Sequence, residues 1–443
     1  MFPIIDFHGQ NVINMLAWLG LLTILLLLFL VMTKKMAAVV ALILVPIITA
    51  LMAGFTSEII NFITDGLKTI APTGVMFIFA ILFFGILTDA GTFKPMIKRL
   101  LKFAGNDPAK VTVATALLAM MVHLDGSGAV TFLVAIPAFL PLYDSLNMKR
   151  TTLATITALA AGTMNILPWG GPTIRAASAL EVSVTTLFNP ILIPVIIGLC
   201  SVLIIAYMLG KKERKNTPEY IKSQKSDTEL SFDSELERPR LFYFNIALIL
   251  IAVALLISGI APPHIIFMVA FALAITLNYP NPKQQGDRIN AHAKAALLMA
   301  SILFAAGCFT GILKGSGMID AMAASSVSMI TPSIGSHLAV LTGLLSMPAS
   351  LLFDPDSFYF GILPLLSTTA SHFGVDSIEV GRAAIMGQMT TGFPVSPLTG
   401  STYLLIGLTG VELGEHQKKT IPFAFLITLI ILSVSILIGA ITL

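Results

Sequence analysis

Several stretches of this chain are apolar for long enough that each could cross a lipid bilayer as one helix. A helix rises about 1.5 Å per residue, so roughly 20 residues span a hydrocarbon core of roughly 30 Å. The runs that approach this length are residues 14–32, 36–54, 187–209, 241–260 and 423–443. Hydrophobic residues make up 56% of the chain and charged residues 11%, a proportion that a water-soluble surface does not tolerate. The sequence therefore predicts an all-α integral membrane protein.

Basic residues between the apolar runs predict the orientation, because cytoplasmic loops are enriched in Lys and Arg. They recur at positions 34–35, 94–102, 149–150, 211–215, 283–288 and 418–419. Placing this set in the cytoplasm predicts a multi-pass protein with both termini outside. The net charge of +3 is expected of such loops and gives no support for nucleic-acid binding. Cys200 and Cys308 lie in separate apolar segments and predict neither a disulfide nor a cysteine-ligated metal.

A polar stretch over residues 211–240 divides the chain into two halves, residues 1–210 and 241–443. The stretch mixes both charges, lacks apolar periodicity and contains Pro218 and Pro239. These properties are typical of a cytoplasmic linker rather than a domain. The two halves then show two unusual features in the same order.

The first repeated feature is a pair of apolar arms, too short to span the bilayer, joined by a polar tip. In the first half, arms over residues 111–122 and 130–143 flank His123-Leu-Asp-Gly-Ser-Gly. In the second half, arms over residues 338–353 and 359–366 flank Asp354-Pro-Asp-Ser-Phe. A 12-residue helix covers only roughly 18 Å. The pattern predicts re-entrant hairpins at about residues 110–146 and 336–372.

The second repeated feature is a helix broken in its middle by Gly and Pro. The breaks fall at residues 167–172, inside a helix of about residues 151–182, and at residues 392–400, inside one of about residues 378–410. Proline removes a backbone donor and disfavours helical dihedrals before it, and glycine permits unusual ones. Counting crossings makes the first hairpin enter from the cytoplasm and the second from outside, which predicts inverted repeats. Isolated kinks are common in membrane helices, but matched interruptions in inverted halves indicate a transporter binding site.

Broken backbone cannot face lipid, so the four interruptions are expected to surround a shared polar cavity. Half-helix N-termini offer free N–H groups to anions there. Arg175, in the first turn after the first break, is predicted to grip a substrate carboxylate; the alternatives are a salt bridge to Glu181 or a place near the outer face. The other predicted substrate-binding positions are Ser127, Gly128, Gly170, Gly171, Thr173, Ser357, Ser396, Thr399, Gly400 and Ser401. Of these, Ser127, Ser357, Thr399 and Ser401 suit helix capping equally well.

Three acids and one histidine are expected at membrane depth, where an ionisable residue costs about 2.5–3.5 kcal/mol by insertion scales and is a functional candidate. Asp125, Asp354 and Asp356 offer hard oxygen atoms that suit Mg²⁺, Ca²⁺ or a proton. His123 is a candidate proton site, because imidazole gains or loses a proton near neutral pH. A turn before Pro355 explains Asp354 as well, and structural hydrogen bonds would explain Asp125 and His123.

Four motifs resemble those of the bacterial citrate–divalent metal:proton symporter family, part of the ion transporter superfamily: His123-Leu-Asp-Gly-Ser-Gly, Asn165-Ile-Leu-Pro-Trp-Gly-Gly-Pro, Asp354-Pro-Asp-Ser-Phe-Tyr-Phe and Gly392-Phe-Pro-Val-Ser-Pro-Leu. The resemblance covers nearly the whole chain. It implies an inner-membrane homodimer in which a scaffold carries a mobile transport domain with an elevator-like movement. It also implies a substrate of citrate bound to a divalent metal of the Mg²⁺ or Ca²⁺ class, carried with protons and without a permanent cofactor.

Charge arithmetic favours such a cargo. Citrate carries about −3 at neutral pH, and each unit charge costs about 2.3 kcal/mol to move inward against 100 mV. A divalent metal leaves −1, which one proton neutralises and two protons convert into a voltage-driven step. Three alternatives stay open: a gluconate or dicarboxylate carrier of the same superfamily, an intramembrane hydrolase and a channel. The sequence lacks the GxSxG elbow typical of many hydrolases, which argues against the second alternative. The matched broken repeats argue against a channel.

Overall fold

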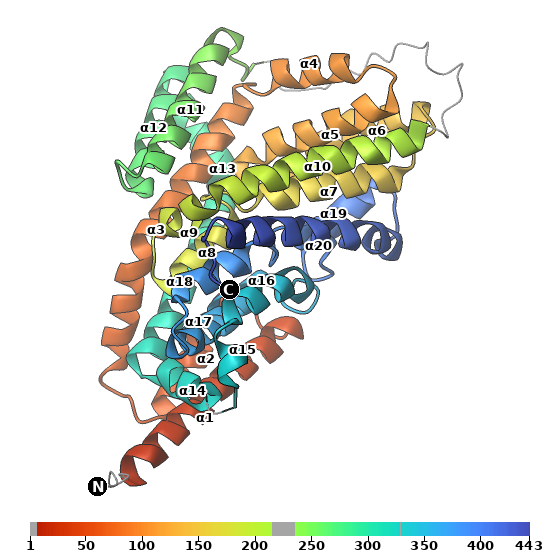
Figure 1. Cartoon of the computed structure of the whole chain (residues 1–443). Coiled ribbons are helices and arrows are strands. Elements are labelled where there is room, and N and C mark those ends of the chain that lie inside the picture. Colours follow the sequence, from red (N-terminus) through yellow and green to blue (C-terminus); the bar gives the residue numbers. More distant parts are fainter. Residues whose placement is uncertain (1–6, 215–234, 328) are drawn as a thin grey trace.

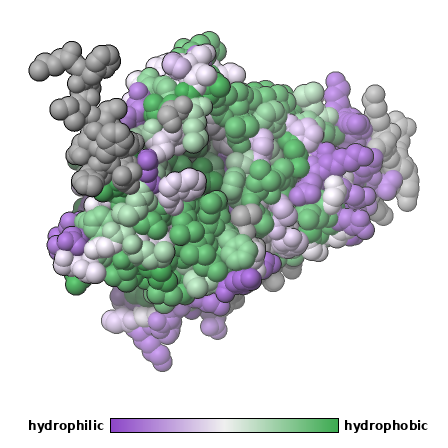
Figure 2. All heavy atoms as spheres, turned by 90° about the horizontal axis from the view of Figure 1, so that it is seen from below, coloured by the Kyte–Doolittle hydropathy of each residue, from purple (hydrophilic) through white to green (hydrophobic). Residues whose placement is uncertain are grey.

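The computed structural model describes residues 7–214, 235–327 and 329–443, and every regular element within them is a helix. Seven of the described segments are long and apolar enough to cross a membrane: Val12–Val31, Ile59–Asp89, Gly128–Ser145, Val184–Glu213, Pro239–Ser258, Pro282–Gly315 and Leu413–Leu437. Hydrophobic residues cover much of the face in Figure 2, with hydrophilic ones gathered mainly toward its edges. The prediction of an all-helical membrane protein is confirmed at this level.

The two halves contain similar successions of helices. The first half has α1 (Phe7–Met32), α2 (Ala38–Met52), α3 (Ile59–Asp89), α4 (Lys94–Ala104), α5 (Pro108–Val122), η1 (His123–Asp125), α6 (Gly128–Ser145), α7 (Arg150–Met164), α8 (Gly171–Leu180), α9 (Val184–Phe188), η2 (Asn189–Ile191) and α10 (Leu192–Glu213). The second half has η5 (Pro239–Leu241), α11 (Phe242–Ser258), α12 (Pro263–Asn278), α13 (Pro282–Gly315), α14 (Met318–Val327), α15 (Pro332–Gly335), α16 (Leu338–Ala349), η6 (Ser357–Ile362), α17 (Leu363–His372), α18 (Ser377–Ile385), η7 (Phe393–Val395), α19 (Gly400–Thr409) and α20 (Leu413–Leu437).

Some predicted boundaries need correction. Helix α2 is only 15 residues long, because residues 33–37 form a turn before it. Helix α20 begins ten residues before the predicted start at 423 and ends at Leu437 rather than 443. Helix α6 has 18 residues, which is long enough to span, so the prediction that both arms of the first hairpin are too short is wrong for this arm.

The predicted linker is only partly described. Residues 215–234 lie outside the described residues, and Lys211–Glu213 still belong to α10. The stretch from Glu235 onward is docked: Arg238 Nε donates to the Asn278 carbonyl at 2.8 Å, and the guanidinium lies 4.8 Å from the centre of the Tyr279 ring. The end of the linker is therefore fixed to the end of α12.

Helices α3 and α13 cross in close contact through glycines. A Cβ on Gly66 would lie 2.0 Å from the Gly307 carbonyl oxygen, and one on Gly311 would lie 2.4 Å from the Phe62 carbonyl oxygen. Small residues allow this approach and are enriched where membrane helices pack. Helix α12 packs on α3, α2 packs on α13, and α11 packs on α12. These five helices form the α3–α13 layer, of which Figure 1 shows α3, α11 and α12 running steeply along one side.

A second group of helices, α5–α8, α10 and α16–α20, forms a central bundle, while α1 packs on α2 and α14. Helix α5 packs on α6, α7 and α10, and α16 packs on α18 and α20. The bundle begins where the sequence signals a helix start: Pro108 occupies the first turn of α5, and the Asp107 carboxylate accepts a hydrogen bond from the Ala109 N–H at 3.1 Å. In Figure 1, α5, α6, α10 and α20 lie across the direction of α3.

Candidate functional site

A cavity of about 350 Å³ lies where the central bundle meets the α3–α13 layer. All four interruptions contribute to its wall: Asp125–Gly128 and Val130; Asn165, Gly171, Pro172 and Arg175; Pro355; and Met389, Phe393, Thr399 and Ser401. The α3–α13 layer closes the other side with Phe77, Ile81, Gly85, Thr88, His292, Ala295 and Met299. Cavities of roughly 300–1,000 Å³ are usual for small-molecule sites.

The tip of the first hairpin is folded by its own hydrogen bonds. Asp125 Oδ1 accepts from the Ser127 N–H at 2.7 Å, and Gly126 takes the left-handed conformation with a φ of 73°. Ser127 Oγ accepts from the Val130 N–H at 3.3 Å and caps α6. The N-terminus of α6 therefore lies in the cavity wall.

The first broken helix is closed by a tight turn between α7 and α8. The Thr173 hydroxyl donates to the Ile166 carbonyl at 2.7 Å, and a Cβ on Gly170 would lie 2.1 Å from the Asn165 carbonyl oxygen. Asn165 Nδ2 also donates to the Met389 carbonyl at 2.9 Å and so joins the two breaks. Gly170 and Thr173 shape the turn instead of lining the cavity, which has Asn165 in its wall.

Arg175 and Asp356 form an ion pair between the two halves. Arg175 Nε donates to Asp356 Oδ1 at 2.7 Å, and the two side chains are 8% and 11% exposed. Glu181, considered above as the partner of Arg175, instead binds Lys314. Among the described residues Arg175 makes no second hydrogen bond, so its two terminal nitrogens are available to a ligand in the cavity that it lines.

The second hairpin and the second break use their polar groups mainly for local structure. Asp354 Oδ1 accepts from the Asp356 and Ser357 N–H groups, each at 3.1 Å. Asp354 Oδ2 and Ser357 Oγ are buried and have no hydrogen-bond partner among the described residues. Ser396 Oγ accepts from the Leu398 N–H at 3.2 Å, and the Thr399 hydroxyl donates to the Phe393 carbonyl at 2.9 Å.

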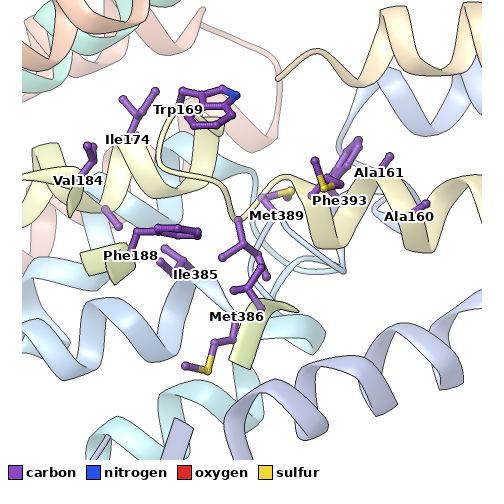
Figure 3. Close-up of a cluster of buried hydrophobic side chains, with 14 of the residues drawn as sticks. Ala160, Ala161, Trp169, Ile174, Val184, Phe188, Ile385, Met386, Met389 and Phe393 are labelled. Atoms are coloured by element: carbon purple, nitrogen blue, oxygen red, sulfur yellow. The ribbon is translucent and has the colours of Figure 1, made fainter. Parts of the chain in front are cut away.

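His123 and Trp169 connect the breaks to their surroundings. The buried His123 ring lies 2.8 Å from Thr131 Oγ1 through Nδ1 and 3.4 Å from Asn165 Oδ1 through Nε2. The indole of Trp169 donates to the Leu124 carbonyl at 2.8 Å and stacks on Phe84 of α3. Figure 3 shows Trp169, Met389 and Phe393 within one buried apolar cluster that spans both breaks.

The predicted site residues thus fall into two sets. Asp125, Ser127, Gly128, Gly171, Arg175, Thr399 and Ser401 line the cavity, and Asp356 binds one of them. His123, Gly170, Thr173, Asp354, Ser357, Ser396 and Gly400 lie outside its lining, so the geometry gives no support for direct contact with a substrate there. The functional role of every one of these residues stays a prediction.

The wall formed by the α3–α13 layer was missed by the sequence reasoning. His292 lines the cavity and binds Asp89, which also binds Arg288. Arg288 belongs to the basic positions that predict a cytoplasmic loop, whereas α13 already begins at Pro282. The available signal was an acid ending one long apolar run, with Arg288 and His292 one helical turn apart at the start of another.

Comparison with known proteins places the chain among carriers. A family model described as citrate transporter matches residues 15–387. A citrate transporter of Bacillus subtilis (strain 168) is 44% identical, with 97% of this chain and 100% of that protein covered. A Mg(2+)/citrate complex secondary transporter of the same organism is 41% identical, with 97% and 99% covered.

Two solved structures share the fold at low sequence identity. The Alcanivorax borkumensis YdaH transporter matches with a TM-score of 0.58 and 14% identity over 87% of each chain. Neisseria gonorrhoeae MtrF matches with a TM-score of 0.58 and 12% identity, covering 87% of this chain and 85% of that one. The first of these structures is described as having an unusual topology, and the likeness concerns the fold alone.

Proposed function

Because this chain belongs to the citrate transporter family and is a secondary transporter of citrate rather than an enzyme, we propose that it imports citrate as a complex with Mg²⁺ or a related divalent metal, together with protons. The observation that carries the proposal is the convergence of four helix interruptions on one cavity, with Arg175 in its wall and Asp356 bound to Arg175. Paired interruptions of this kind mark the binding sites of secondary transporters.

A metal–citrate complex matches the charges of this ion pair better than free citrate does. The complex presents a cation and carboxylates side by side, and Asp356 and Arg175 present the opposite charges side by side. On binding, the guanidinium would exchange Asp356 for a citrate carboxylate, and Asp356 would turn to the metal. Magnesium is usually held by one or two protein carboxylates plus substrate oxygens and water. The relative described as a Mg(2+)/citrate complex secondary transporter supports this choice of cargo.

Helix N-termini add to the affinity for carboxylates in this proposal. Helices α6, α8 and α19 begin at Gly128, Gly171 and Gly400, and the first turns of all three contribute residues to the cavity wall. The first N–H groups of a helix have no intrahelical partner and carry a partial positive charge. Together with one guanidinium they suit a ligand with several carboxylates, as citrate has.

We assign the α3–α13 layer to a scaffold and the central bundle to a transport domain that moves against it by an elevator-type mechanism in a homodimer. The packing supports two inverted repeats: α12 lies on α3 as α2 lies on α13, and α5 contacts α7 and α10 as α16 contacts α18 and α20. The cavity lies near the end of α3 that precedes the basic helix α4, which the distribution of charges assigns to the cytoplasm. The structure would then be a cytoplasm-facing state with both termini outside.

Labelled citrate uptake into proteoliposomes tests the proposed function. With an imposed pH gradient, alkaline inside, Mg²⁺ should stimulate uptake and a chelator should abolish it. Parallel reactions with Ca²⁺ and other divalent ions give the metal preference. Uptake that is unchanged by the chelator would show that free citrate is the cargo. Competition by unlabelled gluconate or dicarboxylates would instead favour a related carrier.

A further inference from the structure

A three-residue polar cluster of Asp89, Arg288 and His292 adjoins the cavity, and His292 lines the cavity. His292 Nε2 lies 2.9 Å from Asp89 Oδ2, and Arg288 Nη1 lies 3.3 Å from the same oxygen. Asp89 ends α3, and Arg288 and His292 lie one turn apart on α13, so the cluster joins the two long helices. The three side chains are 18–23% exposed, and His292 is the member that lines the cavity.

The ring of His292 is held in one orientation. It packs face-on against the backbone of α3, because a Cβ on Gly85 would lie 2.7 Å from both Cγ and Nδ1 and 2.8 Å from Cδ2. Asp89 accepts from Nε2, which fixes that nitrogen as the protonated one in the neutral ring. Among the described residues Nδ1 has no hydrogen-bond partner, so its lone pair can accept a proton from the cavity that His292 lines.

Several charged groups lie around the His292 ring. Asp89 accepts from the imidazole of His292 and also binds Arg288, so one carboxylate serves two side chains. Asp125 and Arg175 line the same cavity as the ring, and Asp287 and Lys294 are exposed residues of α13 itself. Helix α2 carries no charged residue, and His264, the titratable group of α12, lies at the opposite end of that helix. The Asp89 carboxylate is thus shared between the imidazole and the guanidinium.

We propose that His292, positioned by Asp89 and Gly85, receives the proton that enters with citrate and releases it toward the cytoplasm. The proton moves from the loaded cavity to Nδ1, Nε2–H stays on Asp89, and Nδ1 then loses the proton to water at the cytoplasmic mouth. This inference rests on the proposed proton-coupled function. It places the proton acceptor on the α3–α13 layer, whereas the residues proposed to hold citrate lie on the central bundle.

The test compares two modes of transport in proteoliposomes. Exchange of labelled for unlabelled citrate at equal pH needs cargo binding and movement but no net proton transfer, whereas accumulation driven by a pH gradient needs both. Each coupled proton can support about tenfold accumulation per pH unit. His292→Gln should exchange citrate like the wild type but lose the accumulation. Asp89→Asn should likewise keep exchange and lose accumulation. His264→Gln is the matched control and should keep both exchange and accumulation.

The possible failures can be told apart. If the wild type does not respond to the pH gradient in the presence of metal, the proton coupling of the proposed function fails. If the wild type responds and His292→Gln accumulates citrate equally well, this inference is overturned. Parallel loss of exchange and accumulation in both variants would assign His292 and Asp89 to binding or folding and would also overturn it.

Discussion

Arg175 and Asp356, 181 positions apart in the sequence, share a short hydrogen bond in a nearly buried setting. Removing one member of such a pair leaves an uncompensated charge that is expensive to keep out of water. The sequence pointed to Arg175 because of its place directly after a helix break. It could not point to the pairing with Asp356, because that contact depends on how the second hairpin packs against the first broken helix.

Substitution of Arg175 tests its role in binding. Arg175→Ala should raise the KM for citrate by about 10- to 100-fold, the value of one or two lost hydrogen bonds to a charged group. Arg175→Lys should give a KM between those of the wild type and Arg175→Ala, because an ammonium cannot contact two oxygens in one plane as a guanidinium does. Arg150→Ala, which removes an exposed arginine paired with Asp144, is the control. Unchanged uptake kinetics in Arg175→Ala would remove this residue from the site.

At the scale of the elements, the glycines and prolines of the sequence predicted where helices stop. The break between α7 and α8 overlaps the predicted residues 167–172, whereas α18 already ends at Ile385, before the predicted break at 392–400. Helix length was less predictable. Pro137 and Pro141 lie inside α6 without ending it, and the helix continues to Ser145. A proline in a membrane helix is tolerated when neighbouring groups satisfy the freed backbone, and that compensation comes from packing rather than from the local sequence.

The crossing of α3 and α13 depends on glycines. Gly66→Ala should lower the stability of the solubilised protein by about 1–3 kcal/mol, because the new methyl group would meet the backbone of Gly307 and force the helices apart. Gly286→Ala, at an open position of the same α13, should instead be neutral or stabilising by about 0.5–1 kcal/mol. Equal melting temperatures for the two variants would contradict this account of the crossing.

The start of α5 should respond to acid. Burial alone would raise the pKa of Asp107, but hydrogen bonds from Arg214 and the Ala109 N–H outweigh it and lower the pKa below the ordinary value of 3.8. The stabilisation is therefore present above pH 3.8 and is lost as the pH falls through the lowered value. Asp107→Ala should cost about 1 kcal/mol at neutral pH and weaken the acid dependence. Thermal unfolding between pH 7 and 3 measures the loss of stability and its dependence on pH. Asp65→Ala, at an exposed position, is the control.

At the scale of the whole molecule, the sequence predicted two halves with the same order of interruptions, and those segments do meet at one cavity. It did not predict the opposite wall. Phe77, Ile81, Gly85 and Met299 belong to long apolar runs whose periodicity does not distinguish a cavity wall from a lipid-facing surface. Only the packing of α3 on α13 reveals which of their faces points inward.

An elevator-type movement should be stopped by joining the two groups of helices. Glu181 follows α8 in the central bundle, and it binds Lys314 near the end of α13. In a chain without Cys200 and Cys308, a short bismaleimide joining the cysteines of E181C/K314C should abolish citrate uptake. The same reagent on D144C/R150C, a pair within the central bundle, should leave uptake unchanged. Transport that continues with the first cross-link in place would exclude relative movement of the two groups.

A carrier that has delivered its cargo must reset with its binding site vacant. A solitary guanidinium in that site would travel through the membrane potential at about 2.3 kcal/mol per 100 mV. The carboxylate of Asp356 pairs with this guanidinium in the empty site, so in the proposed cycle the return of this part of the site would move no net charge. In the proposed cycle, the same contact would leave the voltage sensitivity to the loaded step, where it would be set by the summed charge of the proposed cargo of metal, citrate and protons.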